Sequence, residues 1–433
     1  MLPNERAPIQ MQDFEVKVKR VRVVGLLRTK ADIVAEQVKD VLKAKTLQEA
    51  LIKSLESKQR LSDLEIFKNV SIHLDAPKNG AGSYDGMEVT FHVKEYRMLT
   101  SSVAANAGTQ SGDASLSFTL RNLLGRAEQL KSVSMTTFPY WGQTLQLHFI
   151  KPYYKNVDKR LLLTLGKTST KHLASGFQEQ VTGAQAEVQF PSFLGKHGLA
   201  LSWDWRNLGE FSSTVPLSVR QDAGHTLKCA VKHTLEADER DDPVAPTSGY
   251  VGRLTQELAG LGGDVFFGKV DLHMQVFREL FWNWVFSLSF WTGFLKPLSP
   301  SKINDRFLLG GPTTLRGFGL WGVGPREQGH SLGGDVYWST GAHLFIPLPF
   351  VPRNELTERV RMHTFLTAGN LIQYRAPFHI GGLVRDVRLS CGAGLAIRLG
   401  IAQIELNYSV PLRARATDSV SPGFQFGIGV EML

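Results

Sequence analysis

The residue types best able to do chemistry in this chain of 433 residues gather in one long loop. The loop runs from Leu308 to Gly334, reads LLGGPTTLRGFGLWGVGPREQGHSLGG, and lies between two strongly alternating segments. A loop of this length is uncommon in a compact protein unless it is functional. An arginine supplies a fixed positive charge, and the glycines permit tight backbone turns. These features predict a segment that folds back and packs inside a hollow structure. The residues expected to anchor it form a motif made of Gly310, Gly311, Pro312, Leu315, Arg316, Gly317 and Phe318.

Two other motifs suggest enzymes, and their context argues against both. Residues 329–333 match the G-x-S-x-G nucleophile pattern, but that motif needs a strand–turn–helix elbow and no helical pattern follows. Residues 166–168 end like a phosphate-binding loop, but Leu161 stands where its first glycine should be. Cys229 and Cys391 are the only cysteines, too few for a disulfide framework or a zinc site. We therefore expect no enzymatic activity, no metal and no cofactor.

Around the loop, apolar and polar residues alternate with a period of two from residue 98 to residue 433. Segments 282–290 and 404–410 have one apolar face and one polar face. The segments run for roughly ten or more residues, against a typical strand of about five or six. Aromatic residues such as Trp203 and Trp205 gather near segment ends, as in membrane-interface girdles. The pattern predicts an all-β transmembrane barrel of about 16 antiparallel strands, with residues 299–333 as a long loop in its lumen.

The chain before residue 98 has a different character. A polar tail of residues 1–13 precedes an expected strand at 14–24, a helix at 29–42 capped by Thr29, and a helix at 46–61. Strands at 69–74 and 87–95 follow, so the expected order is β-α-α-β-β. We predict an α+β domain over residues 14–97. The N-terminus has no apolar signal-peptide core, which favours synthesis in a eukaryotic cytosol.

The net charge of +9 raises the question of nucleic acid binding. The basic residues are scattered along the chain and no recognition motif accompanies them. Solvated surface and barrel lumen account for the charge better, so we expect no nucleic acid partner.

The loop motif, the α+β front and the strand-rich back together resemble the outer-membrane β-barrel insertase superfamily, in which POTRA domains precede a barrel. The segments from Gly333 to Leu344 and from Pro347 to Phe350 are also similar to that family. A single POTRA-like domain and the missing export signal are most like its mitochondrial sorting-and-assembly branch, in the animal form. The resemblance implies an integral barrel in the mitochondrial outer membrane, with the POTRA domain in the intermembrane space.

The last strand resembles the β-signal of mitochondrial barrels, which the family reads in its clients. The fitting residues are Gln425, Gly427, Val430 and Met432. An ordinary outward-facing strand would show much the same apolar face, so the match is only supportive. Closure of the barrel pairs the first strand with the last, and the first strand is small, polar and poor in aromatics. We expect the weakest seam there, formed by Leu99, Ser101, Val103 and Ala105 with Phe424, Phe426 and Ile428.

The resemblance implies that an opened seam receives β-barrel precursors such as porin and releases them sideways into lipid. It also implies metaxin-like accessory subunits and a cristae-organising contact-site complex as partners. Two alternatives remain open. One is a channel for solutes or polypeptides, lined by Arg388, Arg398, Lys228 and Lys232. The other is a scaffold for membrane-contact complexes.

One departure from the family concerns the loop arginine. Acidic residues of neighbouring barrel-wall strands hold it in the family, and those positions are His343 and Thr367 here. Arg316 then needs a different partner. Asp335, another lumenal acid and a backbone carbonyl are the candidates.

Overall fold

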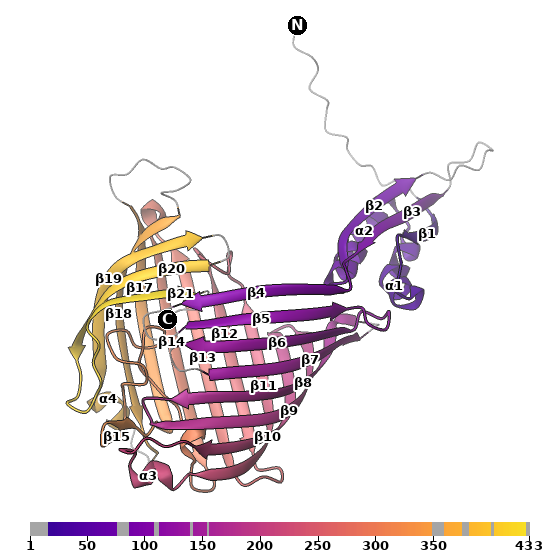
Figure 1. Cartoon of the computed structure of the whole chain (residues 1–433). Helices are drawn as coiled ribbons and strands as arrows, with labels where there is room; N and C mark the ends of the chain where they lie inside the picture. The colour runs from indigo at the N-terminus through magenta and orange to yellow at the C-terminus, as the bar shows by residue number, and fades with distance from the viewer. Residues whose placement is uncertain are drawn as a thin grey trace. The chain divides into compact units, whose positions relative to one another are not determined.

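The computed structural model shows two compact units (Figure 1). The described residues are 16–75, 86–107, 112–138, 142–153, 156–348, 359–374, 381–399 and 402–429. The smaller unit combines Met1–Ser101 with the segments Phe118–Lys131 and His148–Leu162. The larger unit is made of Ser102–Ser117, Ser132–Leu147 and Leu163–Leu433. The smaller unit thus includes two later segments that the expected domain of residues 14–97 did not contain.

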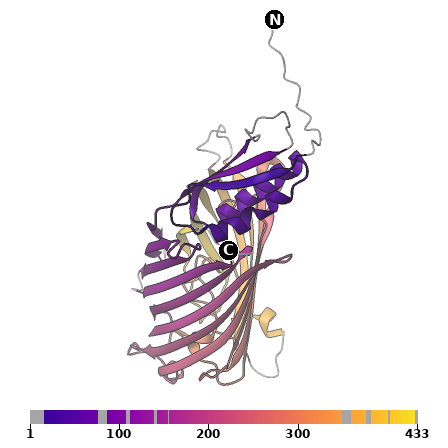
Figure 2. The same ribbon diagram turned by 90° about the vertical axis from the view of Figure 1, so that its right-hand side faces the viewer.

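The N-terminal part of the smaller unit has the expected β-α-α-β-β order. It consists of β1 (Val18–Val24), α1 (Ala31–Val38), the short 3-10 helix η1 (Lys39–Lys43), α2 (Leu47–Asp63), β2 (Phe67–Asp75) and β3 (Met87–Glu95). Strand β3 is central, parallel to β1 and antiparallel to β2. The helices cover one face of this sheet (Figure 2), and Val34, Leu61 and Phe91 are fully buried between the two layers.

Thr46 and Thr29 precede the two helices but have different roles. The Thr46 side chain accepts a hydrogen bond from the Glu49 backbone N–H at 3.2 Å and so caps α2. The expectation that Thr29 caps α1 is wrong, because Lys30 occupies that position without a side-chain cap. Thr29 instead donates its hydroxyl to the Glu95 carboxylate at 2.6 Å. The Thr29 backbone N–H donates to the same carboxylate at 3.0 Å, so Thr29 is bound to the end of β3 one residue before the cap position.

A single sheet of 16 strands forms the rest of the chain, as expected from the alternating pattern. The sheet is strongly curved (Figures 1 and 2). The strand pairs from β9 to β21 are all antiparallel. Its strands are β4 (Leu99–Ala107), β5 (Gly112–Arg121), β6 (Gln129–Phe138), β7 (Gly142–Tyr153), β8 (Asn156–His172), β9 (Phe177–Ser192), β10 (Gly195–Gly209), β11 (Gly224–Asp238), β12 (Gly249–Ala259), β13 (Phe267–Glu279), β14 (Val285–Pro297), β17 (Val336–Pro347), β18 (Val360–Ile372), β19 (Arg388–Leu399), β20 (Ala402–Arg413) and β21 (Gly423–Gly429).

The two faces of the sheet differ as a membrane barrel requires. Along β14, Phe286, Leu288 and Phe290 are exposed, whereas Ser287 and Ser289 are fully buried on the other face. Apolar side chains therefore point outward and small polar ones inward. Among the described segments, no helix is both long and apolar enough to cross a membrane.

The order of the sheet runs from β21 to β4, so the first and last barrel strands are its two ends. Within the described residues, no backbone pairing joins these end strands to each other. The seam expected between them is thus the one place where the ladder is interrupted in this part of the chain. In the described residues, β4 and β21 are therefore the two edge strands of the sheet.

The long loop spans residues 298–335, between β14 and β17. It contains the 3-10 helix η3 (Ile303–Asp305) and the two-stranded ribbon of β15 (Arg326–Glu327) and β16 (His330–Ser331). Leu309, Leu315 and Phe318 of this loop are buried in a cluster with wall residues that include Leu295 and Leu371. The loop therefore packs against the inner face of the sheet. Shorter helices lie at η2 (Phe281–Asn283), α3 (Leu217–Arg220) and α4 (Gly381–Arg385).

Candidate functional site

Arg316 is the centre of the loop motif and has an acidic partner on the wall. Its side chain is 3% exposed and its Nη2 donates to Oε2 of Glu405 on β20 at 2.8 Å. The guanidinium also lies 5.0 Å from the centroid of the Phe365 ring, within cation–π range. Of the three candidate partners expected for Arg316, the lumenal acid is therefore the correct one. Asp335 is engaged elsewhere, since its carboxylate accepts the Tyr374 backbone N–H at 2.9 Å.

The backbone of the motif is also hydrogen-bonded to the barrel wall. Ser390 of β19 donates its hydroxyl to the carbonyl oxygen of Arg316, and the Thr367 hydroxyl lies 2.7 Å from that of Ser390. The next N–H, that of Gly317, donates to Oε1 of Gln425 on β21 at 3.3 Å. Ser409 of β20 donates to the same oxygen at 3.0 Å. The motif thus contacts three consecutive wall strands, and the last of them borders the seam.

Two glycines of the motif adopt backbone conformations that other residues rarely take. Gly310 has φ +115°, and a Cβ there would lie 2.8 Å from the Gly319 carbonyl oxygen. Gly317 has φ +81°, and its Cβ would lie 3.3 Å from the Ser390 Cβ. Both close approaches explain why glycine is needed at these positions. Leu315 and Phe318 are fully buried.

His343 belongs to a hydrogen-bond chain that reaches Glu405. Asn407 donates its Nδ2 to Oε2 of Glu405 at 3.0 Å, so its Oδ1 accepts from Nδ1 of His363 at 3.0 Å. His363 Nε2 is then the acceptor for Nδ1 of His343, 2.9 Å away. All of these side chains are nearly inaccessible to solvent. The chain orients the carboxylate that Arg316 needs, although neither histidine contributes a negative charge.

Glu405 was missed as the partner although the sequence contains a signal for it. The segment from Gln403 to Ser409 predicts a strand whose polar face includes Glu405. No other acidic residue lies between Asp386 and Asp418. A search for an acidic partner of Arg316 in the last strands would therefore have found Glu405 first.

The turn between β20 and β21 contacts the loop motif directly. Phe318 and Val420 form an isolated antiparallel bridge. The Ser421 N–H donates to the Gly317 carbonyl at 2.8 Å, and the Gly319 N–H donates to the Ser419 carbonyl at 2.8 Å. The last hairpin and the motif are thus joined by backbone hydrogen bonds as well as by side chains.

The expected seam residues lie on the two end strands of the sheet. Leu99, Ser101, Val103 and Ala105 are exposed along β4, and Phe424 is exposed on β21 while Gln425 is buried. Gly427 and Ile428 pair through their backbones with Glu405 and Ile404. Val430 and Met432 of the expected β-signal lie outside the described residues. No pairing brings the two sets of seam residues together in the described parts of β4 and β21.

The lumenal cations that would suit a channel are largely paired. Lys228 contacts Glu257 at 2.6 Å, Arg388 contacts Asp418 at 2.8 Å, and Arg398 contacts Asp242. Such pairing cancels much of the positive field that a selective anion pore would use. In the described residues no three His, Cys, Asp or Glu side chains are grouped so that they could hold a metal ion.

Comparison with known proteins agrees with this architecture. Residues 122–432 match the Omp85 superfamily domain. The chain is 39% identical to sorting and assembly machinery component 50 homolog A of Xenopus laevis, over all of this chain and 93% of that protein. It is also 39% identical to the Homo sapiens component 50 homolog, over 98% of this chain and 92% of that protein.

Among solved structures, BamA from Haemophilus ducreyi lacking POTRA domains 1–3 has a similar fold. The TM-score is 0.79 at 19% identity, covering 96% of this chain and 84% of that one. The chain therefore belongs to the Omp85 superfamily and, within it, to the family of the sorting and assembly machinery component 50 homologues.

Proposed function

We propose that this chain inserts and assembles β-barrel precursor proteins into the mitochondrial outer membrane through the seam between β4 and β21. The observation that carries the proposal is the loop motif held against β19, β20 and β21 by Arg316, Gly317 and their partners. An unpaired edge in lipid leaves backbone N–H and C=O groups unsatisfied, at several kcal/mol each. A precursor strand that supplies those hydrogen bonds is therefore bound strongly through its backbone.

In the proposed mechanism, the β-signal of a precursor pairs with the free edge of β4. Precursor hairpins then add one after another, and the new barrel leaves sideways when its own ends pair. The motif keeps β21 in place during this exchange through the Gly317–Gln425 hydrogen bond. Because only hydrogen bonds are exchanged, the reaction needs no covalent step, no nucleotide and no cofactor, and we propose that the chain is not an enzyme.

The partners follow from this role. We propose membership of a sorting-and-assembly complex in the outer membrane, with β-barrel precursors such as porin as clients and lipid around the barrel. Metaxin-like accessory subunits and the cristae-organising contact-site complex are proposed as further partners, with the N-terminal domain in the intermembrane space. The family to which the chain belongs supports these assignments.

The test is assembly of newly synthesised porin in mitochondria depleted of this protein and supplied with wild type, Arg316→Ala or Arg415→Ala. Arg415 is a control from the turn of the last hairpin, because its ion pair with Asp386 is solvent-exposed and its backbone N–H contact with Asp418 is kept by alanine. We expect depletion to block porin assembly while helical outer-membrane proteins still insert. Wild type and Arg415→Ala should restore assembly, and Arg316→Ala should not.

Normal porin assembly in depleted mitochondria would contradict the proposal. The channel would then be favoured by a large conductance of the purified protein in planar bilayers. The scaffold would be favoured by lost membrane contacts with intact barrel assembly.

A further inference from the structure

A second buried arginine lies close to the loop motif but belongs to a separate ion pair. Arg388 begins β19, and its Nε and Nη2 each donate to one carboxylate oxygen of Asp418 at 2.8 Å. The side chains are 1% and 0% exposed. This is a bidentate, charge-assisted contact in a dry environment, where removing one partner leaves a costly unpaired charge. It shares no side chain with the Arg316–Glu405 pair.

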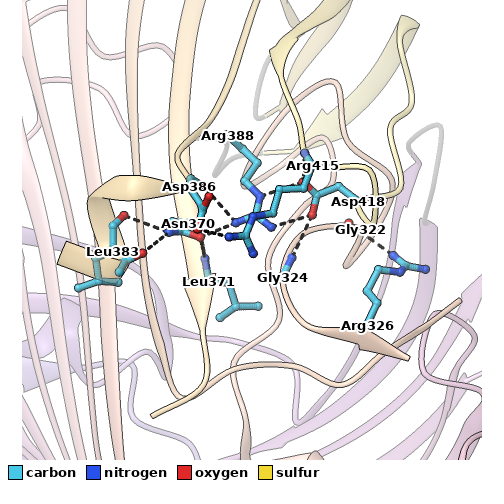
Figure 3. A network of polar contacts seen from close by, with 11 residues as sticks. Gly322, Gly324, Arg326, Asn370, Leu371, Leu383, Asp386, Arg388, Arg415 and Asp418 are labelled. Atoms are coloured by element: carbon cyan, nitrogen blue, oxygen red, sulfur yellow. Dashed lines mark hydrogen bonds and ion pairs between the residues drawn. The ribbon is translucent and has the colours of Figure 1, made fainter. Parts of the chain in front are cut away.

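The remaining hydrogen-bonding groups of this pair are also used (Figure 3). Arg388 donates through Nη1 to Oδ1 of Asn370 and to the carbonyl of Asp386. Asn370 in turn donates to the carbonyls of Gly382 and Leu383, at 3.1 and 3.0 Å. The network therefore reaches α4 through Asn370 and the segment just before β19 through the Asp386 carbonyl.

Asp418 has a different position, because it lies in the turn just before β21. Its carboxylate accepts the backbone N–H of Arg415 at 2.7 Å, and the N–H of Gly324 in the long loop at 3.5 Å. The neighbouring Ser419 N–H donates to the Gly322 carbonyl at 2.9 Å. The last strand begins five residues after Asp418, at Gly423. The network thus connects three loops at the point where the seam strand starts.

We propose that Arg388 and Asp418 are positioning residues that form a second latch on the last hairpin. The latch fixes the start of β21, and the seam cannot release this strand until Asp418 leaves Arg388. The inference rests on the proposed function only for its use, since β21 has to stay in place while precursor strands add to β4. Arg316 anchors the loop to the wall, whereas Arg388 anchors the seam strand itself.

The chain offers a matched control at the other end of the long loop. Arg206 of β10 contacts Asp305 at 2.6 Å, and these side chains are 5% and 3% exposed. Like the proposed latch, this is a buried arginine–aspartate pair, but it holds the long loop to the wall. It differs in touching neither β21 nor the turn before it. Asp418→Asn and Asp305→Asn therefore remove the same charge from similar pairs at different places.

The experiment is amide hydrogen–deuterium exchange of the purified full-length protein in lipid nanodiscs, without a client. We expect Asp418→Asn to speed exchange of residues 423–429 by about tenfold or more, because local opening no longer has to break an ion pair. Asp305→Asn should speed exchange in β10 and around η3 but leave residues 423–429 as in wild type.

A general loss of stability would be revealed by equal effects of the two variants on residues 423–429, and that result would overturn the latch. No effect of Asp418→Asn there would overturn it too. If the single variants do not fold, the neutral pairs Arg388→Gln/Asp418→Asn and Arg206→Gln/Asp305→Asn provide the same comparison, because neither leaves a buried charge alone. We expect only the first pair to speed exchange of the last strand.

Failure of the latch and failure of the insertase are separable in these measurements. Exchange without a client reports on the latch alone, and porin assembly reports on function. Fast exchange in Asp418→Asn with normal porin assembly in depleted mitochondria would keep the latch and reject the insertase. Unchanged exchange with blocked porin assembly would do the reverse.

Discussion

The two strands that border the seam are held in very different ways. On β4, the side chains from Ser101 to Ala105 are exposed, and the Ser102 hydroxyl is hydrogen-bonded to that of Ser117 at 2.6 Å. On β21, Gln425 is 3% exposed and its amide oxygen accepts two hydrogen bonds from the interior. The long loop and the turn before β21 add backbone contacts to the same strand.

This difference indicates that the sides of the seam have unequal tasks. Strand β4 is stabilised chiefly by backbone pairing with β5, so it can exchange an edge partner without disturbing buried charges. Displacing β21 would break contacts in the lumen. The first strand is therefore suited to receive a new strand, and the last one to act as a fixed boundary until its contacts are released.

Among substitutions that should weaken β21 more than β4, Glu405→Gln is expected to have the largest effect. The variant leaves the Arg316 guanidinium buried without its anionic partner, which typically costs about 3–5 kcal/mol. We expect lower thermal stability of the purified barrel and weaker protection of β21 than of β4. Equal loss of protection on both strands would show that the loop stabilises the whole barrel and does not act on one side of the seam.

Acidification should loosen the smaller unit, to which Leu99–Ser101 of β4 belong. Burial alone would raise the pKa of Glu95, but hydrogen bonds from the Thr29 hydroxyl and from the backbone N–H groups of residues 27–29 lower it from 4.5 to about 2. The folded form thus binds a proton less readily than the unfolded form. The stabilisation is complete above pH 4.5 and disappears as the pH falls through about 2, a loss on the order of 1–2 kcal/mol once solvent screening is included.

Far-ultraviolet circular dichroism of the full-length protein checks this, because α2 is its longest described helix. Wild type should lose helical signal as the pH falls from 4.5 to about 2. Glu95→Gln should start from a lower stability and depend less on pH in this window. An identical pH dependence of the two proteins would assign the acid sensitivity to another carboxylate.

Gly317→Ala should weaken the hold on β21 by backbone strain alone. A non-glycine residue at φ +81° with a Cβ 3.3 Å from Ser390 costs about 1–3 kcal/mol. We expect faster amide exchange in residues 423–429 and unchanged exchange in β4. Gly209 provides a control substitution, because nothing lies within 4 Å of a Cβ there. The strain argument fails if alanine at 209 has as large an effect on β21 as alanine at 317.

The smallest contrast is between one serine on each side of the seam. Ser409→Ala removes a fully buried hydroxyl that donates to Gln425, which should cost about 1 kcal/mol. Ser102→Ala removes a hydroxyl from an exposed strand position, where changes usually stay within about 0.5 kcal/mol. Urea unfolding midpoints of the two variants measure the difference. Equal midpoints would remove the energetic asymmetry between the strands.

Much of the fold could be predicted because its elements depend on local patterns. Alternation with a period of two predicted the strands and their number, and the helical stripe ending near residue 61 predicted α2. Thr29 shows where this fails, since its hydroxyl is bound by Glu95, a residue 66 positions away. Local capping rules contain no information about so distant a partner.

The site could be predicted only in part, for the same reason. The glycines and Arg316 were identifiable because a long loop with a buried charge is unusual in itself. The partner of Arg316 depends on which wall residue faces it, and this is set by the register of β20 and by the depth of the loop. Arg388 illustrates the limit well. The sequence indicated a lumenal cation, but only the structure shows that Asp418 neutralises it.

The ion pairs of the long loop also constrain the order in which this chain can fold. Asp305 binds an arginine 99 residues earlier, and Arg316 binds a glutamate 89 residues later. Contacts of such high sequence separation form slowly, because long segments must be ordered before any energy is gained. The loop cannot be completed until β20 is in place. A truncated or stalled chain would therefore carry an uncompensated arginine in its lumen. Its barrel becomes stable only when the last hairpin has formed and Glu405 pairs with Arg316.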